Sequence, residues 1–391
     1  MSERKGYNNT HLKYRNRGIV LQLIANEALS RIDITKRMGL TRMAITNIVN
    51  ELIEDGYIEE GATKEKAQVG RNPILLDITN RSPLAAGIHI SRNTLYAILT
   101  DIRLSALYID EIPLQEENTE SLKEKICLLL DRLHAYRDEK MPQRKILGIG
   151  VSAPGPLDPK TGTLLTPKDF YGIENLPIKD FLEERYRLPV FAENDMNASA
   201  LAERLRGSAQ NCSNFLYLGI TNGIGAGIVV DGRLYGKESV SVGEIGHMCI
   251  NFNGPTCSCG NRGCLETYAT MPIILERLKE ASGKESVALT DFEVLSKNED
   301  CHQIFMDVTG KLSYALINAV NLLDPECIVV GHEGVFLPNK YLKEIQSRIE
   351  KRILASGYKS VPVYPSAFSL GAPVYGSAAM VVCRLFEGEL I

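Results

Sequence analysis

The chain has 391 residues, of which 24% are charged, and its formal net charge at pH 7 is −4. A chain of this length has room for two or three domains with hydrophobic cores of their own. The acidic balance excludes a general electrostatic attraction to nucleic acid, although a local basic surface can still bind it. No run approaches the roughly eighteen apolar residues of a membrane span, and the N-terminus lacks the apolar core of a signal peptide. Nine cysteines without an export signal favour a reducing cytoplasm.

Two helices are predicted near the N-terminus. The first covers residues 15–26, and its apolar face consists of Val20, Leu23 and Ile24. Ser30 begins the second, because Asp33 lies three residues further on, as in a capping box. Ile34 and Met38 are expected to face inward from this second helix.

A third predicted helix follows the short turn Gly39-Leu40-Thr41 and runs to Asp55, with Thr41 as its cap. Its expected buried stripe consists of Ile45, Ile48, Val49 and Leu52. Helix, glycine-containing turn and helix form the helix-turn-helix pattern, whose second helix lies in the major groove of DNA. The DNA-binding candidates at the outward N-terminal end of that helix are Thr41, Arg42, Met43, Thr46 and Asn47. Arginine and asparagine make paired hydrogen bonds to guanine and adenine edges, but a small three-helix domain that binds no DNA has the same pattern.

Two short predicted strands, residues 57–60 and 73–78, flank a polar loop and complete the outline of a winged helix. Within that loop Arg71 stands beside Gly70, and such an arginine can enter a narrow minor groove of DNA. The alternative for Arg71 is a solvated linker. Residues 1–82 are therefore expected to form a DNA-binding domain and its linker.

A second cluster of informative residues lies near the middle of the chain. Cys257, Cys259 and Cys264 fall within eight residues, and His247 lies ten residues before the first of them. One imidazole and three thiolates form a tetrahedral ligand set for Zn²⁺, and the two glycines between the last two cysteines allow a sharp turn. The sequence predicts one structural zinc ion per chain with no open position for water. A surface loop with incidental cysteines or a disulfide is the alternative.

From residue 84 onward, strand-like apolar runs alternate with helical segments, which predicts an α/β architecture. The segment Gly243-Glu244-Ile245-Gly246-His247 and the cysteine motif after it resemble the signature of the ROK family, which contains bacterial sugar kinases and sugar-responsive transcriptional repressors. The resemblance implies an actin-like, ribonuclease H-like sugar-kinase fold with a ligand cleft between two α/β lobes. The lobes are expected to cover residues 83–195 and 196–391, with the C-terminal helix packing back on the first. The N-terminal region resembles the DNA-binding domain of ROK repressors, which ROK kinases normally lack.

The resemblance also implies a set of sugar-binding residues, which are Asn194, Asp195, Glu244, His247 and Glu266. In the family kinases the aspartate that matches Asp195 acts as the base. Carboxylates and amides suit a sugar because they share hydrogen bonds with neighbouring hydroxyls in fixed directions. Taken alone, Asn194 and Asp195 would also fit an ordinary helix cap. One nitrogen of His247 is expected to bind zinc while the other meets a sugar hydroxyl.

The phosphate-binding loops of the family kinases are only partly present. The first normally reads DxGGTK, and the matching residues here are His89, Ser91, Arg92, Asn93 and Thr94. Side chains at positions that need close backbone approach obstruct phosphate groups. The second loop, residues 219–227, keeps most of its glycines, and a Gly331-x-x-Gly334 turn would lie near an adenosine. The sequence therefore predicts that the kinase-like domain is catalytically inactive.

These features favour a transcriptional repressor of sugar-metabolism genes that is released from operator double-stranded DNA by a monosaccharide inducer. A homodimer or a higher oligomer is expected, because helix-turn-helix proteins usually read two half-sites. Glucose and N-acetylglucosamine suit the polar set, and xylose stays open. A sugar kinase with an added DNA-binding domain and a zinc-responsive metal sensor are the alternatives. A cytoplasmic protein without a membrane span is expected, and the family also permits a partner from the phosphotransferase system.

Overall fold

A computed structural model describes residues 9–63, 73–168, 170–237 and 239–391. The chain folds into two compact units. The first consists of Met1–Val151, Lys179–Phe191 and Ser377–Ile391, and the second consists of Ser152–Ile178 and Ala192–Gly376. The chain therefore passes from one unit to the other four times, and each unit is assembled from segments that are distant in the sequence.

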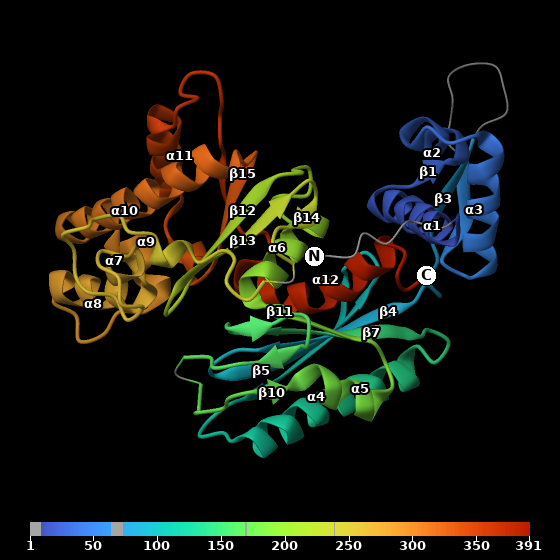
Figure 1. The fold of residues 1–391 in the computed structure, drawn as a ribbon, viewed down its shortest axis with the longest axis horizontal. Helices are drawn as coiled ribbons and strands as arrows, with labels where there is room; N and C mark the ends of the chain where they lie inside the picture. Colours follow the sequence, from blue (N-terminus) through green and yellow to red (C-terminus); the bar gives the residue numbers. More distant parts are fainter. Residues whose placement is uncertain (1–8, 64–72, 169, 238) are drawn as a thin grey trace. The chain divides into compact units, whose positions relative to one another are not determined.

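Helices and a small sheet form the N-terminal part of the first unit (Figure 1). The helices are α1 (Asn9–Asn26), α2 (Arg31–Met38) and α3 (Arg42–Glu54). Strands β1 (Leu29–Ser30), β2 (Ile58–Thr63) and β3 (Ile74–Ile78) pair antiparallel in the order β1-β3-β2. The predicted helix-turn-helix and the strands of the wing are thus present. Helix α1 begins at Asn9 rather than at residue 15, because its first turns are largely exposed and leave no apolar pattern in the sequence.

Local signals in the sequence fix the second and third helices. The hydroxyl of Ser30 accepts the Asp33 backbone N–H at 3.3 Å, and the Asp33 carboxylate accepts the Ser30 backbone N–H at 3.2 Å. Thr41 caps α3 by accepting the Ala44 N–H at 3.2 Å. The buried residues of α3 are those predicted: Ile45, Ile48, Val49 and Leu52. On α1 the fully buried leucine is Leu21, and the predicted Leu23 is only partly buried.

The first unit also contains a five-stranded sheet in the order β11-β7-β4-β5-β6. Its strands are β4 (Leu84–Ile90), β5 (Thr94–Asp101), β6 (Ala106–Pro113), β7 (Ile146–Ala153) and β11 (Val190–Asn194). Helix α4 (Thr119–Lys140) packs on β5 and β6, and α5 (Ile178–Tyr186) lies beside it in Figure 1. Gly87 of β4 and Gly150 of β7 lie against Ser377 of α12 (Ala372–Phe386), so this helix packs on the sheet as well.

The N-terminal helices and strands contact the rest of the first unit through α1 and β3. The Arg103 guanidinium, in the turn between β5 and β6, donates hydrogen bonds to the carbonyl oxygens of Ala25 at 3.0 Å and Ile24 at 3.4 Å, and it pairs with Asp77 of β3. A Cβ at Gly18 of α1 would overlap the carbonyl group of Phe386, at the end of α12. Helix α1 is therefore held from two sides by segments that lie far from it in the sequence.

The second unit is built on a five-stranded sheet in the order β14-β13-β12-β15-β16. Its strands are β12 (Phe215–Ile220), β13 (Ile224–Val230), β14 (Arg233–Leu234), β15 (Cys327–His332) and β16 (Val363–Pro365). Strands β12 and β15 are parallel, with Phe215 beside Cys327 and Ile220 beside His332. Both strands are buried along their whole length, as expected for parallel strands that are covered on both faces.

The two faces of this sheet carry different cores. Leu216, Leu218 and Ile220 pack in a large apolar cluster with residues of α8 (Met271–Ser282), α10 (Glu299–Leu323) and α11 (Asn339–Arg352). Phe215 and Tyr217 belong to a smaller cluster with Ala200 of α6 (Asp195–Arg206). This alternation is the ordinary period of a strand, and it places Tyr217 on the α6 face. The remaining elements are short: β8 (Leu157–Asp158), β9 (Thr163–Leu164), β10 (Leu176–Pro177), α7 (Glu266–Ala269) and α9 (Phe292–Leu295).

Among the described residues, Ser369–Phe386 is the one segment with the length and composition of a membrane span. Within the protein, 72% of that segment is buried. It contains α12, so its apolar character is explained by packing inside the fold.

Candidate functional site

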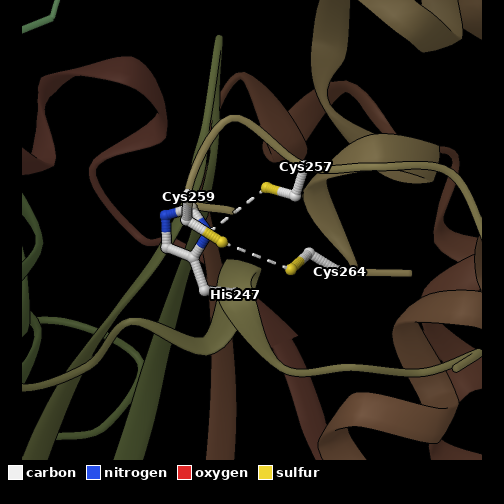
Figure 2. A group of neighbouring side chains, drawn as sticks. All are labelled: His247, Cys257, Cys259 and Cys264. Carbon is white, nitrogen blue, oxygen red and sulfur yellow. Dashed lines mark hydrogen bonds between the residues drawn. The ribbon is translucent and has the colours of Figure 1, made fainter. Parts of the chain in front are cut away.

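The predicted metal ligands of the second unit lie together: His247, Cys257, Cys259 and Cys264 offer ligand atoms that are all within 4.8 Å of one another (Figure 2). The backbone turns back on itself here, because the Cys257 N–H donates to the Asn261 carbonyl at 2.8 Å and the Gly260 N–H donates to the Cys257 carbonyl at 3.0 Å. Gly260 and Gly263 adopt φ values of +92° and +65°, which residues with a Cβ rarely adopt. The sharp turn that the glycines predicted is therefore present.

Two of the separations match those around one tetrahedral ion, and all ligand atoms lie within 4.8 Å of one another. The Sγ atoms of Cys259 and Cys264 are 3.7 Å apart, and the Sγ of Cys257 is 3.6 Å from Nδ1 of His247. With a Zn–S bond of about 2.3 Å and a Zn–N bond of about 2.05 Å, tetrahedral angles require separations of about 3.8 Å between sulfurs and about 3.6 Å between sulfur and nitrogen. All nine cysteines lie in the described residues and are free thiols, so the disulfide alternative does not describe this loop.

The three thiols differ in how readily they ionise without a cation. A hydrogen bond from the backbone N–H of Asn261 lowers the pKa of the Cys259 thiol to about 7. Burial raises the pKa of Cys257, and it raises the pKa of Cys264 to about 12. Because thiolates are the form that binds metal, the attraction of a cation must offset the cost of ionising two buried thiols.

Glu266, the first residue of α7, lies directly beside these ligand atoms. Its Oε1 accepts a hydrogen bond from the Cys257 thiol at 3.1 Å and is 3.4 Å from Nδ1 of His247. Both contacts are favourable only while the Cys257 thiol and Nδ1 of His247 carry a proton that faces the Glu266 carboxylate. The sequence had connected Glu266 with a sugar, and its closeness to the cysteines follows from the turn that brings residue 266 back over residue 257.

Glu244 and His247 are placed by a short 3-10 helix, Ile245–His247, that follows β13. The Ala226 N–H of β13 donates to the Gly243 carbonyl at 2.8 Å and anchors the segment. Glu244 keeps exposed surface, yet the protein around it removes enough water from its carboxyl to raise the pKa. The charges of Glu266 and Asp195 raise that pKa further, and His247 opposes them. These four members of the predicted sugar set therefore lie close enough to interact electrostatically.

Asn194 and Asp195 lie where β11 meets α6. The Asn194 side chain accepts the Asn197 N–H at 2.8 Å and caps the helix, so the helix-cap interpretation correctly describes that oxygen. Asp195 is the first residue of α6, where the positive end of the helix dipole stabilises a carboxylate. Its Oδ2 lies 3.7 Å from Nε2 of His332. The sugar-binding role of both residues stays a prediction.

Two residues of this site were missed in the sequence. The Tyr217 hydroxyl of β12 is 3.0 Å from Nδ1 of His332 and accepts the His332 backbone N–H at 3.2 Å. His332 is only 8% exposed, and its φ of +52° costs a residue with a side chain about 1–3 kcal/mol. The sequence did contain a signal for His332, because this polar residue ends the otherwise apolar strand β15, directly after Gly331. From the sequence, only the glycines of that turn, Gly331 and Gly334, were predicted to lie near a ligand.

The glycine loop at residues 219–227 has a packing explanation that does not involve a nucleotide. A Cβ at Gly227 would lie 2.5 Å from the Met196 carbonyl oxygen and 2.8 Å from the Ala200 Cβ. A Cβ at Gly219 would overlap the Met196 side chain. These glycines let the first turns of α6 lie directly on β12 and β13. At Gly223, by contrast, the nearest atom to an added Cβ is Glu266 Oε2, at 3.9 Å.

The first predicted phosphate loop is the tight turn between β4 and β5, in the first unit. The two strands form an antiparallel hairpin, with His89 beside Tyr96. The Ser91 hydroxyl donates to the Thr94 carbonyl at 2.8 Å and accepts the Thr94 N–H at 3.1 Å. His89 is buried and stacks on Tyr96, with ring centroids 6.1 Å apart. The side chains that replace the acid and glycine are thus used inside the turn.

The DNA-binding candidates on α3 point away from its buried stripe. Thr41, Arg42 and Asn47 are exposed, and Met43 is 71% exposed although it is apolar. Thr46 is partly buried, and its hydroxyl donates to the Arg42 carbonyl at 2.8 Å. Arg71, the predicted wing residue, lies outside the described residues.

Comparison with known proteins places these features in context. The ROK family model matches residues 85–383, and a winged helix-turn-helix DNA-binding model matches residues 12–59. The chain is 31% identical to a putative xylose repressor of Caldicellulosiruptor sp. (strain Rt8B.4), over 96% of this chain and 97% of that protein. It is 28% identical to the DNA-binding transcriptional dual regulator NagC of Escherichia coli (strain K12), over 97% of this chain and 95% of the regulator.

Solved structures of ROK family proteins superimpose on this chain. A ROK family transcriptional regulator, described as a homologue of the E. coli Mlc protein, superimposes with a TM-score of 0.82 and 27% identity over 97% of this chain and 98% of that one. A ROK hexokinase from Thermus thermophilus superimposes with a TM-score of 0.65 and 28% identity. That match covers 97% of the hexokinase but only 76% of this chain. The expected α/β sugar-kinase fold with an N-terminal winged helix-turn-helix is confirmed.

Proposed function

Because this chain belongs to the ROK family, we propose that it is a transcriptional repressor of sugar-metabolism genes that a monosaccharide releases from operator DNA. The observation that carries the proposal is the presence, in one chain, of a winged helix-turn-helix with an exposed recognition helix and a ROK domain. Relatives that match over nearly the full length are named as repressors. In this proposal residues 1–82 bind DNA, and residues 83–391 form the sugar-responsive domain.

The N-terminal end of α3 is proposed to read the major groove. Arg42 and Asn47 are exposed and have the side chains that pair with guanine and adenine edges. Thr41, Met43 and Thr46 complete the surface of this helix end, and Arg71 is proposed to enter the minor groove. Two copies of this helix on a two-fold axis would read half-sites about one DNA turn apart, so a homodimer or a higher oligomer is part of the proposal.

The proposed sugar ligands are Asn194, Asp195, Glu244, His247 and Glu266. Three of them bear carboxylates, which accept hydrogen bonds from hydroxyl groups, and burial around Glu244 strengthens such bonds. A hexose such as glucose is our proposed inducer. D-xylose and N-acetylglucosamine are its competitors, because repressors similar to this chain are named for them.

Zinc is the proposed structural cofactor, held by His247 through Nδ1 and by Cys257, Cys259 and Cys264. A closed four-ligand site supplies a cross-link between the 3-10 helix and the cysteine turn, which stiffens the segment that carries Glu244 and Glu266. Cation binding requires Cys257 and Nδ1 of His247 to be unprotonated. Glu266 then no longer accepts a hydrogen bond from either group, and its carboxylate is available to a ligand.

The ROK domain is proposed to be catalytically inactive. Ser91 uses its hydroxyl within the β4–β5 turn, and the glycines at 219 and 227 are explained by packing on α6. Two observations favour the alternative of a sugar kinase, since Asp195 is retained and a hexokinase shares the fold. A base alone does not suffice, because phosphoryl transfer needs a donor held in line with the acceptor.

The proposal makes a thermodynamic demand. If the sugar releases operator DNA, it binds the DNA-incompetent state more tightly, and operator DNA must weaken sugar binding by the same factor. A repressor of this kind acts in the cytoplasm. The family resemblance adds a phosphotransferase-system protein as a partner, which the same demand would allow as a competing ligand.

The proposal is tested by measuring operator affinity with and without D-glucose, D-xylose and N-acetylglucosamine. The operator is first selected from genomic fragments that the purified protein retains. One sugar should weaken wild-type binding about 5–150-fold, the usual range of allosteric coupling. Asp195→Ala and Glu244→Ala should bind operator like wild type but ignore the sugar. A sugar that binds tightly and leaves operator affinity unchanged would contradict the proposal, whereas chelator-sensitive and sugar-insensitive binding would indicate a metal sensor.

A further inference from the structure

We propose that His332 is a positioning residue for Asp195: its Nε2–H donates to the Asp195 carboxylate and fixes which oxygen of that carboxylate meets the ligand. The proposal deepens the proposed function, because it gives Asp195 the role of a sugar ligand. It concerns residues of three separate elements, β12, β15 and α6, which all belong to the second unit.

The position of the His332 ring depends on an unusual backbone. Along β15, Cys327 and Val329 face the α6 side of the sheet, whereas Ile328 and Val330 face the other core. Regular alternation would turn residue 332 to the face of Val330, away from α6. Its φ of +52° and ψ of −141° break that alternation. The ring of His332 therefore lies beside Tyr217, on the α6 side.

Gly331 makes this placement sterically feasible. A Cβ on residue 331 would overlap the Tyr217 hydroxyl. Without that Cβ, the hydroxyl reaches the His332 backbone N–H at 3.2 Å and Nδ1 at 3.0 Å. Tyr217 is completely buried, so the ring is clamped by a group that cannot turn away into water.

The tautomer of the ring depends on where the Tyr217 hydroxyl sends its proton, since both Nδ1 of His332 and the Ser199 side chain are hydrogen-bond partners of that hydroxyl. The proposal takes Nδ1 as the acceptor. The Tyr217 oxygen already accepts the backbone N–H of His332. When its own proton is donated to Nδ1, the neutral ring carries its hydrogen on Nε2. That atom is buried and has no hydrogen-bond partner among the described residues. A buried donor left without a partner is costly, so the site favours a ligand-bound state in which Nε2 is paired.

Asp195 is the acceptor within reach of this donor. Its Oδ2 is 3.7 Å from Nε2, which is too long for a hydrogen bond and too short to hold a water molecule between the atoms. A small shift of the carboxylate closes the gap. The carboxylate is then held in a fixed orientation toward a ligand hydroxyl.

This arrangement also changes what Asp195 can do. A hydrogen bond from a buried imidazole stabilises the carboxylate anion and makes it a poorer base. A sugar ligand needs a well-oriented acceptor, whereas a kinase needs a carboxylate that takes a proton from the attacking hydroxyl. His332 thus suits an aspartate that binds a sugar without activating it.

The first test needs no ligand. The chain has 6 histidines, and two-bond ¹H–¹⁵N correlation spectra of histidine-labelled protein distinguish the tautomers of each ring. The His332 signal is identified by its loss in His332→Asn. We expect a proton on Nε2 in the wild type and loss of this preference in Tyr217→Phe. A neutral ring with its only hydrogen on Nδ1 would overturn the proposal, because Nε2 could not donate.

The second test uses two amide variants with D-glucose, D-xylose and N-acetylglucosamine as probes in calorimetric titrations. His332→Gln places an amide N–H near the position of Nε2, whereas His332→Asn places one near Nδ1. Asparagine also tolerates positive φ better than most residues, so His332→Asn should melt no lower than His332→Gln. We expect His332→Asn to weaken binding about tenfold or more, as for one hydrogen bond to a charged group, and His332→Gln to stay within about threefold of wild type.

The outcomes separate this proposal from the function on which it rests. If the wild type binds a probe and His332→Asn binds it equally well, the positioning role is wrong. If both variants lose binding equally, the ring serves packing rather than donation, which also overturns the proposal. If the wild type binds none of the probes, the proposed function fails, and the tautomer of His332 still decides whether Nε2 is a donor toward Asp195.

Discussion

The cysteine turn at residues 257–264 and the glycine loop at residues 219–227 are both rich in glycine, and both resemble ligand-binding signatures. In the turn the four predicted ligand atoms lie within 4.8 Å of one another. In the loop, glycines at 219 and 227 make room for Met196 and Ala200 of α6. The difference teaches that cysteine and histidine indicate a metal site through their own ligand atoms, whereas a glycine indicates only that there is no room for a Cβ. What occupies that space has to be read from the fold.

The cysteine turn gives the largest expected effect. Cys264→Ser removes a completely buried ligand, so the variant should lose the roughly one zinc per chain that we expect in the wild type. Its free energy of unfolding should fall by more than about 4 kcal/mol, as losses of a metal site do. Elemental analysis and chemical denaturation measure both quantities. Cys249→Ser is the matched control. Cys249 is exposed and lies opposite Cys264 in an isolated backbone β-bridge, but it is not among the predicted metal ligands.

Retention of zinc by Cys264→Ser, or wild-type protein free of zinc when purified without chelator, would contradict the metal assignment. The turn would then be held by its backbone hydrogen bonds alone. The glycines of both segments would then be explained by backbone geometry and packing alone.

The glycine loop gives a smaller effect. Gly227→Ala places a Cβ against the Met196 backbone and the Ala200 side chain, and we expect a loss of about 1–3 kcal/mol of stability from overpacking. Gly223→Ala, in the same loop, brings its Cβ only to van der Waals distance from Glu266 Oε2, at 3.9 Å, and should change stability by less than about 0.5 kcal/mol. Thermal and denaturant unfolding of the ligand-free protein compare the pair. Equal stability of the two variants would mean that the loop glycines are kept for a ligand instead.

The smallest expected effect is the absence of a reaction. If the ROK domain is inactive as proposed, coupled assays with ATP and D-glucose, D-xylose or N-acetylglucosamine should show no sugar-dependent turnover, because phosphoryl transfer needs a donor held in line with the acceptor. Sugar phosphate that forms with wild type and disappears with Asp195→Asn would make this chain a kinase. The glycine loop would then be a ligand-binding segment, as the cysteine turn is proposed to be.

Residues close together in the sequence produced the predictions that succeeded. The Ser30–Asp33 capping box, the buried stripe of α3 and the cysteine turn each span fewer than about four helical turns, where spacing alone decides which side chains meet. Local patterns carry less information at an element's end, so α1 begins six residues before its predicted start at residue 15. They also could not separate Leu21 from Leu23 on α1, because both are apolar and only the neighbouring elements decide which is buried.

The contact of Tyr217 with His332, and of His332 with Asp195, lay beyond such reasoning. More than a hundred residues separate Tyr217 from His332 (217 to 332), and the ring reaches its place through φ of +52° and ψ of −141°, a combination that residues with a Cβ rarely adopt. The packing role of the loop glycines was equally hidden, because Met196 meets them only after α6 folds onto β13. Chemistry that depends on three distant strands and helices becomes visible only in the folded chain.

The route of the chain between its two units has a consequence for biosynthesis. Residues 377–391 belong to the unit that contains the DNA-binding helices, yet they leave the ribosome after the whole of the second unit. The carbonyl of Phe386, on which Gly18 of α1 packs, is therefore made only after the whole of the second unit. A nascent chain can fold its recognition helix early, but its first unit stays incomplete until residues 377–391 have been made. Messages that end prematurely would then yield a DNA-reading module whose supporting unit was never finished.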